Sequence, residues 1–274
     1  MTDAASAAAL SRSPAAARPG LGVLRRIRPF LLLAAFGATW QFVSTMVLDS
    51  TTATLLPPPS AVIIGGWDLI QTGELFRHLR DSLKRELVAF AFAATAIPLG
   101  IAMGWSKLVN EQLDVLVEVL RPIPPLAWIP LSILWFGIGD TQNQFIIFLG
   151  MFFPILLNTI AGVKNIEPNL IHAARCLGAS EVKVLWRVVL RACLPSIITG
   201  VRVGLGVGWM ALVAAELVGA NSGLGFLIND ARTLLRTDYV IVGMVTIGVV
   251  GLLIDRGVRM LGAWMMPWSR VMSQ

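Results

Sequence analysis

The chain has 274 residues, of which 56% are hydrophobic and only 14% are charged. A soluble domain carries about 25% charged residues, so most of this chain is predicted to lie in a lipid bilayer. The formal net charge of +6 does not indicate a nucleic-acid-binding surface. Lys and Arg gather at the ends of apolar runs rather than in a basic stripe with interleaved aromatic residues.

Residues 1–29 are predicted to form a cytoplasmic amino-terminal tail. They are rich in Ala, Ser, Pro and Arg and run directly into the first apolar segment. No small-residue cleavage site follows that segment, so we expect an uncleaved first span rather than a signal peptide.

Six apolar segments are predicted to cross the membrane, because about 20 apolar residues are needed to span roughly 30 Å of hydrocarbon. They are residues 30–48, 87–105, 121–140, 145–163, 194–217 and 240 to about 261. The predicted fold class is therefore an all-α polytopic membrane protein with six transmembrane helices. Residues 87–262 would form a core of five helices, and residues 263–274 a cytoplasmic tail. The third segment contains four prolines, so we expect it to be bent or partly non-helical where protein can shelter the freed carbonyl groups.

The distribution of basic residues predicts that both termini lie in the cytoplasm. In this orientation most Lys and Arg residues fall in cytoplasmic segments, as the positive-inside rule requires. The external basic residues are Arg77, Arg80, Lys84, Arg85, Arg232 and Arg236. Cys176 and Cys193 both fall in a segment placed in the cytoplasm, where thiols stay reduced, so no disulfide is expected.

A long external loop is predicted over residues 49–86. Its part from Ser60 to Glu86 is amphipathic, with apolar residues at Ile63, Ile64, Trp67, Ile70, Leu75, Phe76 and Leu79. We expect an amphipathic helix there that lies on the external membrane–water interface. A solvated loop is the alternative.

The cytoplasmic connection between the fourth and fifth spans, residues 165–195, is long enough to hold structure of its own. Its apolar residues predict two short amphipathic helices and are Ile171, Ala174, Leu177, Val184, Leu185, Val188 and Val189. Gly178 suits a left-handed cap that ends the first helix, and Ser180 is a favourable N-cap residue for the second. Two helices joined by a tight glycine turn would form a rigid knob with a shallow, alanine-rich surface, suited to insertion into a groove on a partner.

The pattern of Ala173 and Ala174, then Gly178, then Leu194 and Pro195 resembles the EAA loop of binding-protein-dependent ABC permeases. In that family the loop is the coupling element that docks on the ATPase subunit. The resemblance implies that role for His172, Ala173, Ala174, Leu177, Gly178, Ala179, Ser180 and Pro195. His172 stands where the family usually has Glu, so a salt bridge made there by other members is not implied here. A generic cytoplasmic helical hairpin is the alternative.

The resemblance extends along the chain through residues 55–62, 120–140, 199–228 and 266–268. These segments are similar to the taurine, alkanesulfonate and nitrate branch of the permeases, and most similar to taurine permeases. This implies a type I importer fold in a bacterial inner membrane. It also implies a second copy of this permease or a paralogue, two copies of an ATPase subunit that bind ATP and Mg, and a periplasmic solute-binding protein. Taurine or another alkanesulfonate is the implied solute, with nitrate, cyanate or a small heterocycle as alternatives.

The fifth predicted span contains five candidate pathway or gate residues, which are Arg202, Gly204, Gly208, Trp209 and Glu216. Charges within a membrane are costly, about 2.5 to 3.5 kcal/mol at the centre, and usually face a cavity or a partner. Arg202 could instead reach the cytoplasmic headgroups, Glu216 could be interfacial, and Trp209 could belong to an interfacial belt. The glycines, which recur every four residues from Gly200, allow close helix packing either within the subunit or across a dimer axis.

The sequence contains no set of residues for catalysis or for metal or cofactor binding. It has no phosphate-binding G-x-x-x-x-G-K-[ST] loop, and its two histidines, His78 and His172, belong to no metal-ligand spacing. Any ATP hydrolysis is therefore expected on another polypeptide. An ion-coupled secondary transporter is the competing class, but it would normally show inverted repeats and ionisable residues deep in several spans.

Overall fold

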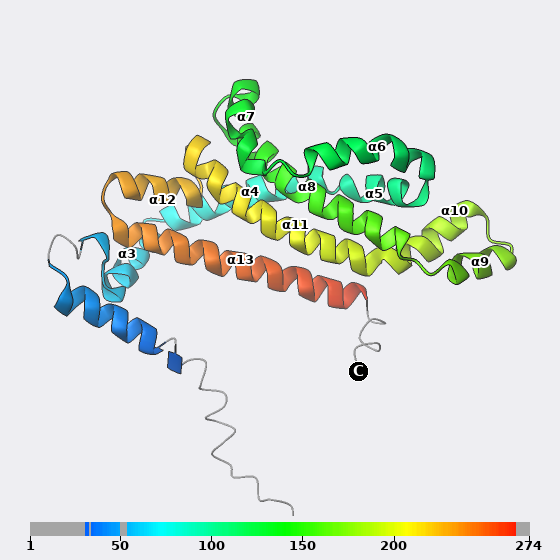
Figure 1. The fold of residues 1–274 in the computed structure, drawn as a ribbon. Helices are drawn as coiled ribbons and strands as arrows, with labels where there is room; N and C mark the ends of the chain where they lie inside the picture. The colour runs from blue at the N-terminus through cyan, green and yellow to red at the C-terminus, as the bar shows by residue number, and fades with distance from the viewer. Residues whose placement is uncertain (1–30, 33, 50–53, 267–274) are drawn as a thin grey trace, which may run out of the picture.

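The structure is a computed structural model that describes residues 31–32, 34–49 and 54–266. All regular structure in these residues is helical, as predicted (Figure 1). After a first helical segment, the elements are η1 (Val43–Val47), α3 (Pro59–Gln71), α4 (Glu74–Ala93), α5 (Ala96–Trp105), α6 (Lys107–Leu120), η2 (Pro125–Trp128), α7 (Ile129–Phe136), α8 (Asp140–Lys164), α9 (Pro168–Cys176), α10 (Glu181–Val184), η3 (Leu185–Val189), α11 (Leu190–Gly219), α12 (Leu224–Thr233) and α13 (Thr237–Met265).

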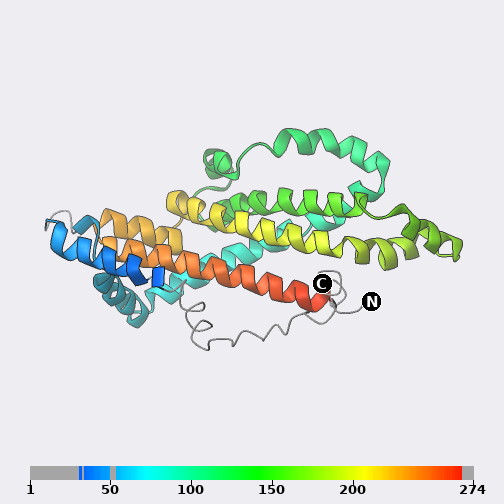
Figure 2. The ribbon, with the colours of Figure 1, turned by 60° about the horizontal axis from the view of Figure 1, so that its bottom comes forward.

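The core lies between α8 and α11, which run side by side, and α13 runs along α11 in both ribbon views (Figures 1 and 2). Small residues on α11 let the two backbones approach closely. A Cβ added at Gly204 would lie 2.9 Å from Cγ1 of Ile155, and one added at Gly208 would lie 2.4 Å from Cε of Met151. The glycine face of α11 is therefore covered by α8 of the same chain. The idea that this face meets its counterpart across a dimer axis was wrong.

Four helices in the described residues are long and apolar enough to cross a membrane. They are Glu74–Trp105, Asp140–Lys164, Glu181–Gly219 and Thr237–Met265. A fifth span results if Lys107–Leu120 and Pro125–Phe136, which are bent by 82° relative to each other, are counted together. The first predicted span, residues 30–48, lies partly outside the described residues, so the count of six stays a prediction.

The second span begins earlier than the sequence predicted. We expected it to start at residue 87, yet α4 begins at Glu74, directly after Gly73 with its positive φ of 75°. Leu75, Leu79 and Leu83, spaced one turn apart, pack against the main core cluster. The expected interfacial helix over 60–86 is thus two helices, and the second is part of the core.

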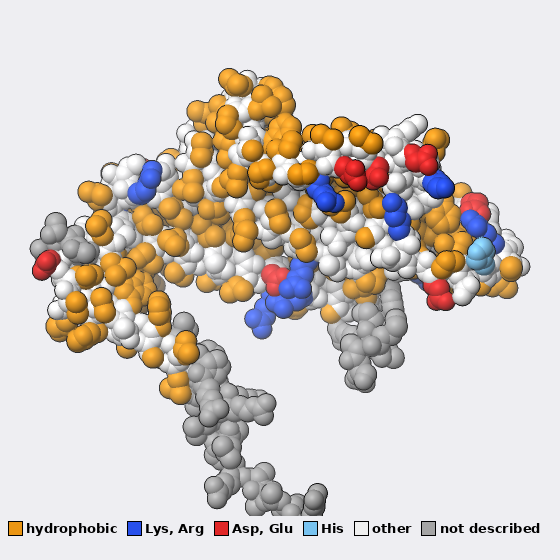
Figure 3. Space-filling model, in the orientation of Figure 1, with side chains coloured by type: hydrophobic (Ala, Val, Ile, Leu, Met, Phe, Trp, Pro, Cys, Tyr) orange, Lys and Arg blue, Asp and Glu red, His pale blue; other side chains and the backbone are white. Residues whose placement is uncertain are grey.

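Helix α3 keeps several of its apolar residues exposed, with Ile63 and Trp67 more than half exposed, although Leu69 is buried. Its position on the membrane–water interface stays a prediction. In the space-filling view, hydrophobic side chains cover most of the visible face, and many of the charged ones gather toward α6, α9 and α10 (Figure 3).

The predicted irregularity of the third segment is confirmed. The chain turns sharply between Arg121 and Pro124, forms a 3-10 turn and then the eight-residue helix α7, which protrudes from the body of the molecule (Figure 1). Pro122, Pro124 and Pro125 have no N–H that could donate the hydrogen bonds needed to continue α6. The bend therefore follows from the residues that predicted it.

The knob's second helix was predicted to be short and separate, and this was wrong. The segments α10, η3 and α11 form one continuous helix from Glu181 to Gly219. Val184, Val189 and Cys193 are buried on one side of it, so the apolar face of the knob continues into the face of the span. Pro195 lies within this helix.

Candidate functional site

The first helix of the knob, α9, ends in a left-handed glycine turn, as predicted. Gly178 has a φ of 79°. Its N–H donates to the carbonyl of Arg175 at 2.9 Å, and the Ala179 N–H donates to the carbonyl of Ala174 at 3.1 Å. These two bonds define a Schellman motif that ends α9. Nothing lies within 4 Å of a Cβ added at Gly178, so glycine is needed there for its backbone conformation rather than for space.

The predicted coupling residues divide into an exposed and a packed set. His172, Ala173, Gly178 and Ser180 are exposed, and Leu177 is 89% exposed. Ala174 and Ala179 are partly buried and pack against the apolar cluster around Val184 and Val189. Ser180 has the extended backbone of an N-cap residue, although its side chain makes no capping hydrogen bond. Pro195 lies on the long helix and not on the knob.

One residue that the sequence interpretation did not single out holds the knob together. The Arg175 side chain donates from Nε and Nη2 to the two carboxylate oxygens of Glu181 at 2.9 and 3.0 Å. Its guanidinium carbon also lies 6.0 Å from the ring centroid of Trp105, the last residue of α5. From the sequence, Arg175 was interpreted only as a positive charge in a cytoplasmic segment. Its partners could not be predicted, because Glu181 follows the turn at Gly178 and Trp105 belongs to a helix distant in sequence.

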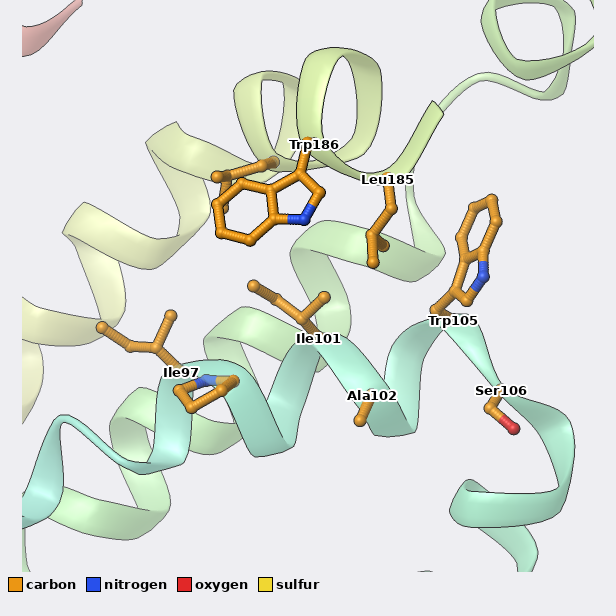
Figure 4. Close-up of a pocket in the computed structure, with 9 residues that line it drawn as sticks. Ile97, Ile101, Ala102, Trp105, Ser106, Leu185 and Trp186 are labelled. Atoms are coloured by element: carbon orange, nitrogen blue, oxygen red, sulfur yellow. The ribbon is translucent and has the colours of Figure 1, made fainter. Parts of the chain in front are cut away.

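A groove separates α5 from the start of the long helix. Its volume is about 550 Å³, and its lining residues are Ile97, Pro98, Ile101, Ala102, Trp105, Ser106, Leu185, Trp186 and Leu190. Side chains from the two elements point toward each other across the gap (Figure 4). Trp186 remains 65% exposed. The long helix is therefore not closely packed on α5 at this level.

Glu216 lies in a buried charged network near the opposite end of α11. It pairs with Arg85 at 2.7 Å, with both side chains at most 4% exposed. Glu216 also accepts hydrogen bonds from the Ser82 hydroxyl and the Gly225 N–H. Arg85 continues the network to Asp140 at 2.7 Å. The Glu216 side chain is enclosed by α4, α12 and its own helix. Its depth in the membrane stays a prediction.

The pairing of Arg85 with Glu216 could not be predicted from the sequence. Arg85 was placed in an external loop, and 131 positions separate it from Glu216. The available signal was the charge of Glu216 itself, which within a membrane segment requires a partner.

The five candidate pathway residues do not come together in one site. Arg202 pairs with Asp255 of α13, which also pairs with Arg259. The Trp209 indole N–H donates to the carbonyl of Ile247 at 3.1 Å, and the ring is only 6% exposed. Gly204 and Gly208 face α8. In the part of the chain that the structure describes, no group of three or more His, Cys, Asp and Glu residues could hold a metal ion.

Comparison with known proteins gives consistent matches. Residues 96–266 match the family described as binding-protein-dependent transport system inner membrane component. The chain is 43% identical to the taurine transport system permease protein TauC of Escherichia coli (strain K12), over 86% of this chain and 87% of that protein. It is 33% identical to the nitrate import permease protein NrtB of Synechocystis sp., over 88% and 90% respectively.

A solved structure shares the fold. A chain of the MetNI methionine ABC transporter, solved in inward-facing conformations, matches with a TM-score of 0.51 and 22% identity. The match covers 67% of this chain and 95% of that chain.

Proposed function

The chain belongs to the family of binding-protein-dependent transport system inner membrane components, and from this premise we propose that it forms half of the membrane path of an ATP-driven importer for taurine or another alkanesulfonate. The exposed knob, in which α9 turns at Gly178 into the long helix, carries this proposal. A rigid, shallow projection at the end of a long membrane helix is suited to receive movement from a partner and pass it into the membrane.

The partner on the knob would be an ATPase subunit. His172, Ala173 and Leu177 offer it an exposed surface on α9 and the turn that follows it. The sequence contains no phosphate-binding loop of the Walker type, so ATP and Mg would be bound by that subunit. Two ATPase copies, one under each permease copy, would complete the cytoplasmic half. This arrangement puts the knob and both termini in the cytoplasm.

The second permease copy would cover the face formed by α6 and α7. Leu134 on α7 is 81% exposed, and Val115 and Val119 on α6 are more than 60% exposed. Irregular backbone flanks α7 at Arg121–Pro124 and at Gly137–Gly139. Irregular backbone at membrane depth is tolerated where protein or a water-filled cavity covers it, but not where lipid does. Because the glycine face of α11 is already occupied by α8, the α6–α7 face is the better candidate.

The solute assignment rests on similarity. The matched relatives include a permease named for taurine and another named for nitrate. Both solutes carry a compact oxyanion, so a small anionic or zwitterionic solute fits each relative. The greater identity to the taurine permease favours taurine or another alkanesulfonate, delivered by a periplasmic binding protein.

The coupling role is tested by replacing Gly178 with Val. A Cβ in the left-handed conformation costs about 1–2 kcal/mol and tilts α9 against the long helix. Gly178→Val should therefore still insert into the membrane but lose ATPase assembly or solute-dependent ATP hydrolysis, measured on the purified complex in liposomes. Ala173→Trp, which adds bulk to an exposed position, should have the same effect.

Gly73→Val is the matched control. Gly73 has a φ of 75°, and nothing lies within 4 Å of an added Cβ, yet it lies between α3 and α4, far from the knob. It should keep assembly and transport. Normal transport by both knob variants at wild-type protein levels would contradict the coupling role.

A further inference from the structure

We propose that Arg175 is a positioning residue that fixes the ATPase-docking helix α9 against both α5 and the long helix Glu181–Gly219. This inference rests on the proposed function of the knob and adds a residue to it. The Arg175 side chain is hydrogen-bonded to Glu181, the first residue of the long helix, and its guanidinium carbon lies 6.0 Å from the ring centroid of Trp105, the last residue of α5. It therefore lies between α9, the long helix and α5, where it can fix the position of α9 relative to both.

The geometry of the Arg175–Glu181 contact restricts the angle between α9 and the long helix. Both carboxylate oxygens of Glu181 are bound by two nitrogens of one guanidinium group, which is a bidentate arrangement. Such a fork fixes direction as well as distance, unlike the point charge of a lysine. The pair also closes over the turn at Gly178, which is otherwise held by two backbone hydrogen bonds.

Helix α9 makes few other contacts with the membrane helices. Ile171 and Ala174 pack against the apolar cluster around Val184. Among the described residues, Arg175–Glu181 is the only ion pair that α9 makes. The groove between α5 and η3 leaves the start of the long helix without close packing on α5 (Figure 4). Without the arginine, α9 could stay docked on its partner and yet rotate relative to both helices.

The pair should matter for coupling more than for stability. Both side chains are roughly half exposed, and exposed ion pairs contribute little to folding. Loss of Arg175 should therefore leave the amount of folded protein unchanged. What should change is the number of solute molecules imported per ATP hydrolysed.

The experiment uses the full transporter in liposomes with its binding protein. Uptake and ATP hydrolysis are measured for Arg175→Glu, Glu181→Arg, the double charge swap and Arg175→Lys. Each single charge reversal should lower uptake per ATP about fivefold or more, the lower end of typical coupling between sites. The double swap should restore much of it, and Arg175→Lys should be intermediate. Arg187→Glu, the same change at an exposed residue of η3, should have little effect.

A second measurement tests, in the permease without its ATPase, whether the Arg175–Glu181 pair fixes the position of α9. Spin labels are placed at Ala173 and at Leu253 of α13, both exposed, in a Cys176→Ser background. Arg175→Glu should broaden the distance distribution, and the double swap should narrow it again.

Unchanged distances with unchanged uptake per ATP would overturn the proposal. Loss of ATPase assembly that the swap does not rescue would also overturn it and make Arg175 a contact to the ATPase. A wild-type chain that neither binds an ATPase nor imports solute would refute the proposed function. The spin-label distances would still show whether Arg175 fixes the position of α9.

Discussion

Arg85 and Glu216 show how charged side chains are accommodated in the membrane helices of this chain. Each is enclosed on all sides, and Ser82, Asp140 and the Gly225 N–H satisfy most of their remaining hydrogen-bonding capacity. The network ties α4 to α8 and to the α11–α12 turn. Glu86, next in sequence, is also buried, but neither of its carboxylate oxygens has a hydrogen-bond partner among the described residues.

Replacing Arg85 with Met should strongly destabilise the permease. Removing one partner of a buried ion pair leaves the other charge uncompensated and typically costs about 3–5 kcal/mol. The loss should appear as a lower midpoint of thermal unfolding in detergent. Arg80→Met is the control on the same helix, because the Arg80 side chain is 77% exposed and should contribute at most about 1 kcal/mol. Equal midpoints for the two variants would show that the buried network does not stabilise the fold.

At the scale of helices, apolar patterning predicted where spans exist better than where they begin and end. The uncharged run at 145–163 lies inside α8, the run at 87–105 covers the end of α4 and all of α5, and the prolines of the third segment predicted its bend. The start of α4 at Glu74 and the continuity of α10 with α11 could not be predicted in the same way. Charges such as Arg85 mark a helix end only if water surrounds them, and their burial depends on partners distant in sequence.

Continuity of the long helix is itself testable. If movement at the knob travels along Glu181–Gly219, then a break below the membrane should uncouple ATP hydrolysis from uptake. Proline inside a helix costs about 3 kcal/mol and removes a backbone hydrogen bond. Arg187→Pro, at an exposed position of η3, should lower uptake per ATP in liposomes while the complex still assembles. Arg187→Ala removes the same side chain without breaking the helix and should leave the ratio unchanged. A similar ratio for the two variants would argue against transmission through this helix.

On the scale of the whole molecule, two exposed apolar surfaces, α13 and the α6–α7 face, differ in whether lipid can cover them. Leu252 and Leu253 are exposed on α13, a regular helix whose backbone groups bond within the helix, so lipid can surround it. The α6–α7 face also exposes apolar side chains, but it carries the exposed acidic residues Glu111, Asp114 and Glu118 of α6 and is interrupted by irregular backbone. The knob could be recognised from the sequence because its residues are contiguous. The subunit contact could not, because the glycine pattern on α11 fits packing within a chain as well as between chains.

The position of the second copy can be tested by cross-linking. In a Cys176→Ser background, Leu134→Cys on α7 should form a disulfide-linked or short-reagent-linked homodimer in membranes, since Leu134 is the most protruding part of the proposed contact and two copies would bring equivalent faces together. Leu253→Cys, also exposed and apolar, should give no dimer because lipid surrounds that face. Dimers are detected by mobility on non-reducing gels, and the cross-linked Leu134→Cys complex should lose transport that returns on reduction. Cross-linking through Leu253 but not through Leu134 would place the subunit contact on α13 and leave α7 to be covered by water or by another protein.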